Sequence, residues 1–100
     1  MKQVHLKIEK VCHCVCTVYY NGKAKVMIID DVFVDPAYRG LGYGQKLMDM
    51  AINLAKKEEI DSIELNVNRD NEVAISLYKK NGFEVTNKDY YRLILNKWTL

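Results

Sequence analysis

The segment from residue 39 to residue 44 reads Arg-Gly-Leu-Gly-Tyr-Gly, a composition suited to binding phosphate groups. Glycines leave backbone N–H groups uncovered, and a helix that begins after such a loop adds the positive end of its dipole. Arg39 supplies a guanidinium for charge-assisted hydrogen bonds. The segment is therefore a candidate loop for a phosphate or a pyrophosphate. The alternative is that its glycines only form a tight turn.

Two common phosphate-binding motifs do not match this loop. A Walker A loop ends in Gly-Lys-Ser/Thr, whereas Gly44 is followed by Gln45 and Lys46. In the dinucleotide fingerprint G-x-G-x-x-G, counted from Gly40, the third glycine position falls on Gln45. The preceding strand also belongs to an expected hairpin and does not open a βαβ unit. The Walker A loop is excluded by the residues after Gly44, and the dinucleotide fingerprint by the spacing of the glycines.

Two adjacent carboxylates interrupt the apolar run that precedes the loop. Asp30 and Asp31 are the side chains there that suit a general base. Neighbouring residues of a strand point to opposite faces, so at most one of them faces a bound substrate. Asp31 is the candidate. The alternative is that one carboxylate faces solvent and the other bonds to local backbone.

Three cysteines, Cys12, Cys14 and Cys16, alternate along one expected strand. An odd number in one short run does not form a disulfide framework, which favours the reducing cytoplasm. Zinc needs converging ligands, and cysteines along a straight strand diverge, so we expect no metal site. The cysteines are better explained as small buried residues. His13 lies between them and is expected on the opposite face.

The bulk composition predicts a single domain that spans residues 1–100. The chain has 100 residues, of which 49% are hydrophobic, and a net charge of +2. A core can form from this fraction without metals or disulfides. The near-neutral charge gives no reason to expect a nucleic-acid partner, and no apolar run is long enough for a signal peptide or a membrane span.

Hydrophobic periodicity predicts an α+β fold with a mixed, mostly antiparallel central sheet and two main helices. Asn21-Gly22 is a strong hairpin signal, Asp70 or Asn71 suits a helix N-cap, and Asn81-Gly82 suits a helix end. The expected strands are residues 4–8, 11–20, 24–34, 62–67, 83–85 and 90–96, and the expected helices are residues 45–57 and 71–81.

Two segments resemble the signatures of the GCN5-related N-acetyltransferases. The first is Val32–Gly44, in which Arg39, Gly42 and Gly44 fill the fixed positions of Q/R-x-x-G-x-G/A. The second is Asn71–Phe83, which resembles N-x-x-A-x-x-L-Y-x-x-x-G-F. Both occur in order and on the expected elements. The resemblance implies the acyl-coenzyme A N-acyltransferase fold, N-terminally shortened.

The resemblance also implies a role for each matching residue. Tyr78 would lie near the thioester sulfur, and Asn71 would help to position the pantetheine or the adenine end. The other implied contacts to acetyl-coenzyme A come from main-chain groups: Val32, Phe33 and Val34 along the pantetheine, and Arg39, Gly40, Leu41, Gly42, Tyr43, Gly44 and Gln45 around the pyrophosphate.

These roles imply an acyl-coenzyme A-dependent N-acyltransferase. An amine attacks the thioester directly in a ternary complex, strand N–H groups freed by a bulge stabilise the oxyanion, and the Tyr78 phenol protonates the departing thiolate. Acetyl-coenzyme A is the expected co-substrate, with an unidentified amine acceptor. The alternative is a non-catalytic coenzyme A-binding module that needs a partner chain to complete the acceptor site.

The chain departs from the family pattern before the first matched segment. Family members begin with a strand and one or two helices that wall the acceptor pocket, whereas the first 25 residues here read as strands. The acceptor wall is then missing, minimal or supplied by another chain. The sheet surface left uncovered makes a homodimer a reasonable hypothesis.

Overall fold

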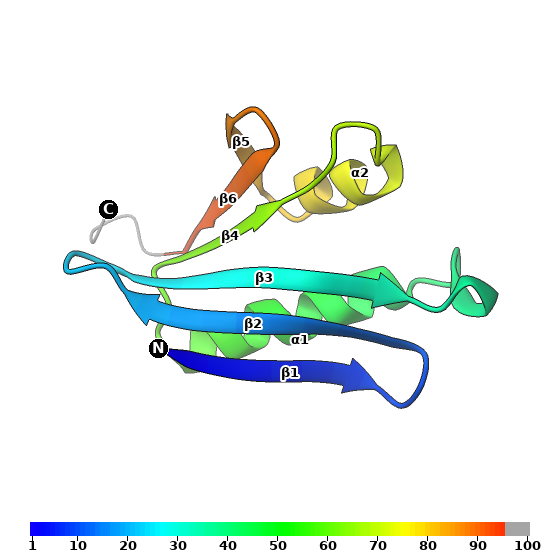
Figure 1. Ribbon diagram of the computed structural model, residues 1–100, viewed down its shortest axis with the longest axis horizontal. Helices are drawn as coiled ribbons and strands as arrows, with labels where there is room; N and C mark the ends of the chain where they lie inside the picture. Colours follow the sequence, from blue (N-terminus) through cyan, green and yellow to red (C-terminus); the bar gives the residue numbers. More distant parts are fainter. Residues whose placement is uncertain (96–100) are drawn as a thin grey trace.

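A computed structural model describes residues 1–95 of the chain (Figure 1). It contains one six-stranded sheet with the order β1-β2-β3-β4-β6-β5 and two α-helices. The elements in chain order are β1 (Lys2–Ile8), β2 (Cys12–Tyr20), β3 (Lys25–Val34), the 3₁₀ helix η1 (Pro36–Tyr38), α1 (Tyr43–Lys57), β4 (Ser62–Asn66), α2 (Glu72–Lys80), β5 (Glu84–Asn87) and β6 (Tyr90–Ile94).

The first three strands form the expected antiparallel meander. Asn21 closes the β2–β3 turn, because its side-chain oxygen accepts hydrogen bonds from the backbone N–H groups of Lys23 and Ala24. Gly22 adopts a φ of 86°, which glycine accommodates without strain. The hairpin signal in the sequence therefore fixes the register between β2 and β3.

The apolar core lies on the face of the sheet that α1 covers (Figure 1). Alternation in β2 buries the three cysteines, whose exposed fractions are 0–2%, and leaves His13 exposed. Helix α1 buries a stripe of four residues against them: Leu47, Met48, Ala51 and Ala55. The expected places of the cysteines and of His13 are confirmed. We call the opposite side of the sheet the open face.

Strands β3 and β4 pair in parallel over only three positions, from Val26–Ser62 to Ile28–Glu64. Beyond Ile28 and Glu64 the two strands diverge, as Figure 1 shows, while β4 stays paired with β6 along its whole length. The sheet is thus mixed and mostly antiparallel, with two main helices, and the expected fold class is confirmed. The divergence opens the sheet near its middle.

Several boundaries differ from the sequence-based ones. Helix α1 begins at Tyr43, two residues earlier than expected, because Gly42 takes a left-handed conformation and serves as its N-cap. Helix η1 was not expected; the Asp35 side chain caps it by accepting a hydrogen bond from Ala37 N–H. Strand β5 is shifted by one residue at its start and extends to Asn87. The end of the last expected strand, Asn96, lies outside the described residues.

Neither helix of residues 1–95 has the length and apolar character needed to cross a membrane.

Candidate functional site

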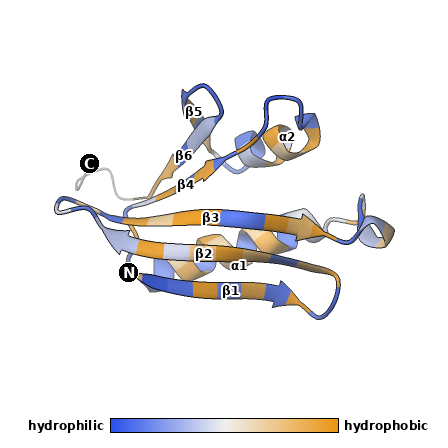
Figure 2. Cartoon of the chain, viewed as in Figure 1, coloured by the Kyte–Doolittle hydropathy of each residue, from blue (hydrophilic) through white to orange (hydrophobic). Residues whose placement is uncertain are grey.

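A β-bulge interrupts β3 where it has separated from β4. Asp30 and Phe33 are three residues apart in β3 but pair with β2 residues that are only two apart, so one extra residue is accommodated between them. Asp31 carries the strain with a φ of 52°. Figure 2 shows the same stretch as a hydrophilic segment within an otherwise apolar strand. The bulge leaves the β3 backbone irregular beside the opening of the sheet.

Asp31, the candidate base from the sequence, lies in this bulge and is exposed. Adjacent residues face opposite sides of a strand only where its pairing is regular, and the bulge breaks the regular pairing here. Asp30 precedes the bulge and alternates regularly with the buried Ile29, so its side chain lies on the open face. The two carboxylates therefore differ in backbone conformation, since only Asp31 has a positive φ.

The glycine loop presents free amide groups at the start of α1. Within residues 1–95, the N–H groups from Gly40 to Gln45 donate no hydrogen bond to the protein, and the first amide of α1 that does so is that of Lys46, to the Gly42 carbonyl at 3.1 Å. Gly40 and Gly42 have φ values of 77° and 88°, and a Cβ at either would meet open space. The loop is a set of donors without a protein partner at the positive end of a helix.

Two further contacts stiffen the loop. Arg39 donates from Nε to the Val34 carbonyl at 2.9 Å, and its guanidinium lies 6.0 Å from the Phe33 ring centroid. Tyr38 and Tyr43 meet edge to face with centroids 5.9 Å apart. Arg39 is therefore tied back to the end of β3, with its remaining guanidinium N–H groups available to a ligand.

Tyr78 of α2 is buried beneath the opening of the sheet, with an exposed fraction of 4%. It lines a narrow cavity between the helices and the sheet, together with Cys14, Ile29, Val32 and residues of α1. Burial raises the pKa of the Tyr78 hydroxyl, and Cys14 raises it further. The phenol thus keeps its proton at neutral pH and remains a hydrogen-bond donor inside the cavity.

The two helices meet at this cavity because one of the loop glycines allows a close approach. A Cβ at Gly44 would lie 3.3 Å from Leu77 Cδ2, so the glycine permits α1 to approach α2. Asn71 caps α2 by accepting a hydrogen bond from Ala74 N–H at 3.2 Å, and Tyr78 is the buried residue of this helix. The two sequence signatures therefore meet in space.

The cysteines form a packed row and no ligand set. The pKa of Cys14 is raised by its hydrogen bond with Cys16 and by burial, so the thiol stays protonated. Within residues 1–95 no three side chains of His, Cys, Asp or Glu converge to hold a metal ion.

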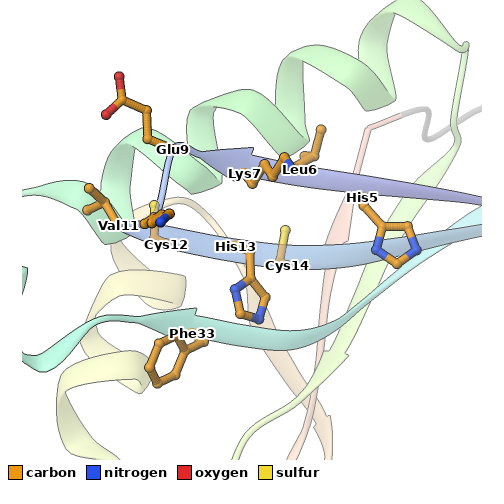
Figure 3. A pocket seen from close by; sticks show the side chains of 10 residues that line it. His5, Leu6, Lys7, Glu9, Val11, Cys12, His13, Cys14 and Phe33 are labelled. Carbon is orange, nitrogen blue, oxygen red and sulfur yellow. The ribbon is translucent and has the colours of Figure 1, made fainter.

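A hollow of about 570 Å³ lies beside the end of the β1–β2 hairpin. Figure 3 shows His13 turned toward Phe33, with His5 farther along the same surface. The His13 and Phe33 rings have centroids 5.4 Å apart. This hollow lies on the β1 side of β3. It shares Cys14 with the cavity of Tyr78, and Phe33 is the one predicted site residue among those that line it. It does not bring the predicted site residues together.

One polar pair near the opening was missed by the sequence analysis. Tyr90 Oη of β6 donates a hydrogen bond to Glu64 Oε1 of β4 at 2.5 Å, and both residues are half-buried. Burial raises the pKa of the Tyr90 hydroxyl, as do its bond to Glu64 and the nearby charge of Asp30. The only signal in the sequence was a single carboxylate in an alternating strand.

Comparison with known proteins relates this chain to one family of enzymes. Residues 7–83 match the model of the acetyltransferase (GNAT) family. N-alpha-acetyltransferase 50 of Danio rerio is 37% identical over 92 residues, which cover 89% of this chain and 53% of that protein. Peptidyl-lysine N-acetyltransferase YjaB of Escherichia coli is 40% identical over 60 residues, which cover 60% of this chain and 37% of that protein.

Among solved structures, Naa50 of Arabidopsis thaliana in complex with a bisubstrate analogue, CoA-Ac-MVNAL, superimposes with a TM-score of 0.70. The two chains are 30% identical, and the match covers 82% of this chain and 62% of the other. The chain thus spans about half the length, or less, of the curated relatives described here.

Proposed function

Because the chain belongs to the acetyltransferase (GNAT) family, we propose that it transfers an acetyl group from acetyl-coenzyme A to a primary amine by direct attack within a ternary complex. The observation that carries the proposal is the opening between β3 and β4, which has free loop amides at one end and the buried Tyr78 beneath it. The named activities of the relatives agree with it.

The residues fit the parts of acetyl-coenzyme A. The uncovered amides of residues 40–45 and the Arg39 guanidinium suit the pyrophosphate. The edge of β3 from Val32 to Val34 lies beyond the last pair with β4. Arg39 occupies the Val34 carbonyl, and the other main-chain groups on that side suit an extended pantetheine arm. Asn71, at the start of α2, is proposed to contact the arm or the adenine end in addition to capping the helix.

The chemistry at the thioester requires three things of the protein. The amine must reach the carbonyl, the developing oxyanion must be stabilised, and the thiolate must be protonated as it leaves. Backbone N–H groups near the bulge at Asp31 suit the second task, and the protonated phenol of Tyr78 suits the third. Asp31 itself lies in the bulge and remains a candidate base on position alone.

The test measures binding and turnover separately. We expect the purified chain to bind coenzyme A in isothermal titration calorimetry and to release free thiol from acetyl-coenzyme A when a peptide amine is added. Two peptides serve as acceptors: one with a free α-amine, and one with a blocked N-terminus and a single lysine. Binding without thiol release on either peptide would favour the non-catalytic coenzyme A-binding module, and the absence of binding would overturn both functions.

We also propose a cytoplasmic location and a homodimer. The three buried cysteines are free thiols, which fits the reducing cytoplasm. Strand β1 pairs on one side only and leaves an edge of the sheet for a second copy, which fits a homodimer. Light scattering at micromolar concentration tests the latter, and a stable monomer would contradict it.

A further inference from the structure

The described structure places ionisable groups on both faces of the sheet where β3 and β4 separate. Ile63 and Leu65 of β4 are buried in the core, so the intervening Glu64 points to the open face. Tyr78 lies on the other side, in the cavity lined by Ile29. The opening is thus flanked by a carboxylate on one face and a phenol on the other.

Glu64 lies where the pairing of β3 with β4 ends and the opening begins. It is the partner of Ile28 in the final β3–β4 pair, and one residue farther along β3 the side chain of Ile29 already lines the cavity. The bulge at Asp31 follows two residues later. A group bound beside Glu64 on the open face could therefore reach the proposed thioester position by passing between β3 and β4. The hollow beside His13 instead lies on the side of β3 that faces β2.

The carboxylate of Glu64 is held in place and remains an acceptor. The Tyr90 hydroxyl donates to Oε1, and its raised pKa keeps it protonated over the physiological range. Since the phenol bonds only one oxygen, the second has acceptor capacity for an N–H donor. This hydrogen bond distinguishes Glu64 from a freely rotating surface carboxylate.

Other charged and titratable groups face the same spot. Asp30 of β3 and Tyr19 of β2 act electrostatically on the Tyr90 hydroxyl, so both lie near it. Arg92 of β6 is the register partner of Glu64 but makes no ion pair with it within residues 1–95. The two carboxylates outnumber the single guanidinium among these groups, so the surface attracts a cation such as a protonated amine.

We propose that the open-face triad Glu64, Tyr90 and Asp30 binds the acceptor as its ammonium ion, and that Glu64 takes the proton which frees the amine for attack. This inference rests on the proposed acetyl transfer. The substrate class is a primary amine, such as a peptide α-amine or a lysine side chain, that can extend through the opening. Glu64 is held by Tyr90, which acts as a positioning residue.

The protons balance as follows. The ammonium ion passes one proton to Glu64, which returns it to water, and the neutral amine then adds to the thioester carbonyl. Collapse of the tetrahedral intermediate forms the amide and breaks the carbon–sulfur bond. The thiolate takes a proton from Tyr78, and the proton lost by the amide nitrogen restores the phenol. The products are the acetylated amine, coenzyme A and one proton in solution.

The experiment compares Glu64→Gln with the wild-type chain on the free-α-amine peptide, whose amine has a pKa near ~8. We expect kcat/KM at pH 6.5 to fall about 100-fold, within the usual range for loss of a general base. The loss should shrink toward pH 9, where the amine is already neutral. Coenzyme A affinity, measured by calorimetry, should not change. Tyr90→Phe should lower kcat/KM about tenfold with the same pH trend.

The matched control is Glu59→Gln, an exposed carboxylate in the turn after α1, which should leave the whole pH profile unchanged. A pH-independent loss in Glu64→Gln would mean a structural role and would overturn the proposal, as would an unaltered profile. If the wild-type chain does not bind coenzyme A, the proposed function itself is overturned. Normal binding with no turnover of either peptide would contradict acetyl transfer and, with it, this role of Glu64.

Discussion

The two edges of β3 differ in how fully their backbone groups are paired. On the β2 side, pairing runs from Lys25 to Val34 and is interrupted only at the bulge, whereas on the β4 side it stops at Ile28. Unpaired strand backbone usually costs stability or invites aggregation, so folds cover it. Here it is left beside a cavity and a loop of free amides. The fully paired edge stabilises the sheet, and the other edge is available to a ligand.

In the short paired stretch of β3 and β4, we expect a substitution to lower the stability of the protein more than elsewhere in the sheet. Ile63 pairs with Met27 there, and both side chains are 0% exposed. Ile63→Ala should lower the free energy of unfolding by about 2–5 kcal/mol, because it leaves a cavity in the core. Urea denaturation checks this.

Ile94→Ala provides the control, since Ile94 is 38% exposed at the end of β6. It should cost about 1 kcal/mol or less, because less apolar surface is lost. Equal costs for the two substitutions would mean that the junction between β3 and β4 contributes no more to stability than the periphery of the sheet.

The Tyr78→Phe substitution tests the role of the tyrosine hydroxyl in the cavity beneath the unpaired edge of β3. We expect kcat to fall about 100-fold, since the substitution removes the proton donor while the ring still packs against Phe83. Coenzyme A affinity and the free energy of unfolding should change little. Turnover with saturating acetyl-coenzyme A and the peptide amine measures the effect.

Tyr91→Phe is the matched substitution on the same side of the sheet, at a tyrosine of β6 that is 6% exposed. It should leave kcat unchanged. A similar loss of kcat in both variants would point to a general effect of removing a buried hydroxyl and against a special role for Tyr78.

Two glycines with nearly identical backbone conformations allow the phosphate loop to be compared with the turn at the fully paired side of β3. Gly42 has a φ of 88° in the phosphate loop, and Gly22 has a φ of 86° in the β2–β3 turn; a Cβ at either would meet open space. Gly→Ala at each should cost about 1–2 kcal/mol of backbone strain. Only Gly42→Ala should also weaken coenzyme A binding, by about tenfold, as measured by calorimetry.

An equal loss of coenzyme A affinity in Gly22→Ala and Gly42→Ala would contradict this prediction. It would mean that strain anywhere in the meander reaches the ligand, and that the amides after Gly40 are not a distinct binding element.

The paired regions were the ones that sequence could predict. Period-two alternation buries the cysteines of β2, and the Asn21-Gly22 pair places the turn, because both effects depend on residues close in sequence. The two signature segments similarly located the loop and Tyr78. Element order followed from these local patterns, and the structure reproduces it.

The open edge could be predicted only in part. The family resemblance implied a bulge in a strand, but its position at Asp31 depends on how β3 registers against β2, which no neighbouring residue indicates. Glu64 and Tyr90 are 26 residues apart and meet only because β4 and β6 pair. The early start of α1 has the same origin: Gly42 can enter a left-handed conformation, but the sequence does not say that it must.

Asn71 offers the smallest and most discriminating test, because it is proposed to serve both the fold and the ligand. Its side chain accepts a hydrogen bond from Ala74 N–H, so Asn71→Ala should cost about 1 kcal/mol of stability, as for other N-caps. Asn71→Ser keeps a capping oxygen but shortens the side chain, so urea denaturation should show stability near that of the wild-type chain. If Asn71 also contacts acetyl-coenzyme A, calorimetry should show weaker binding in both variants. If Asn71→Ser binds coenzyme A as tightly as the wild-type chain, Asn71 serves only as the cap of α2. The proposed ligand contacts would then not include the start of that helix.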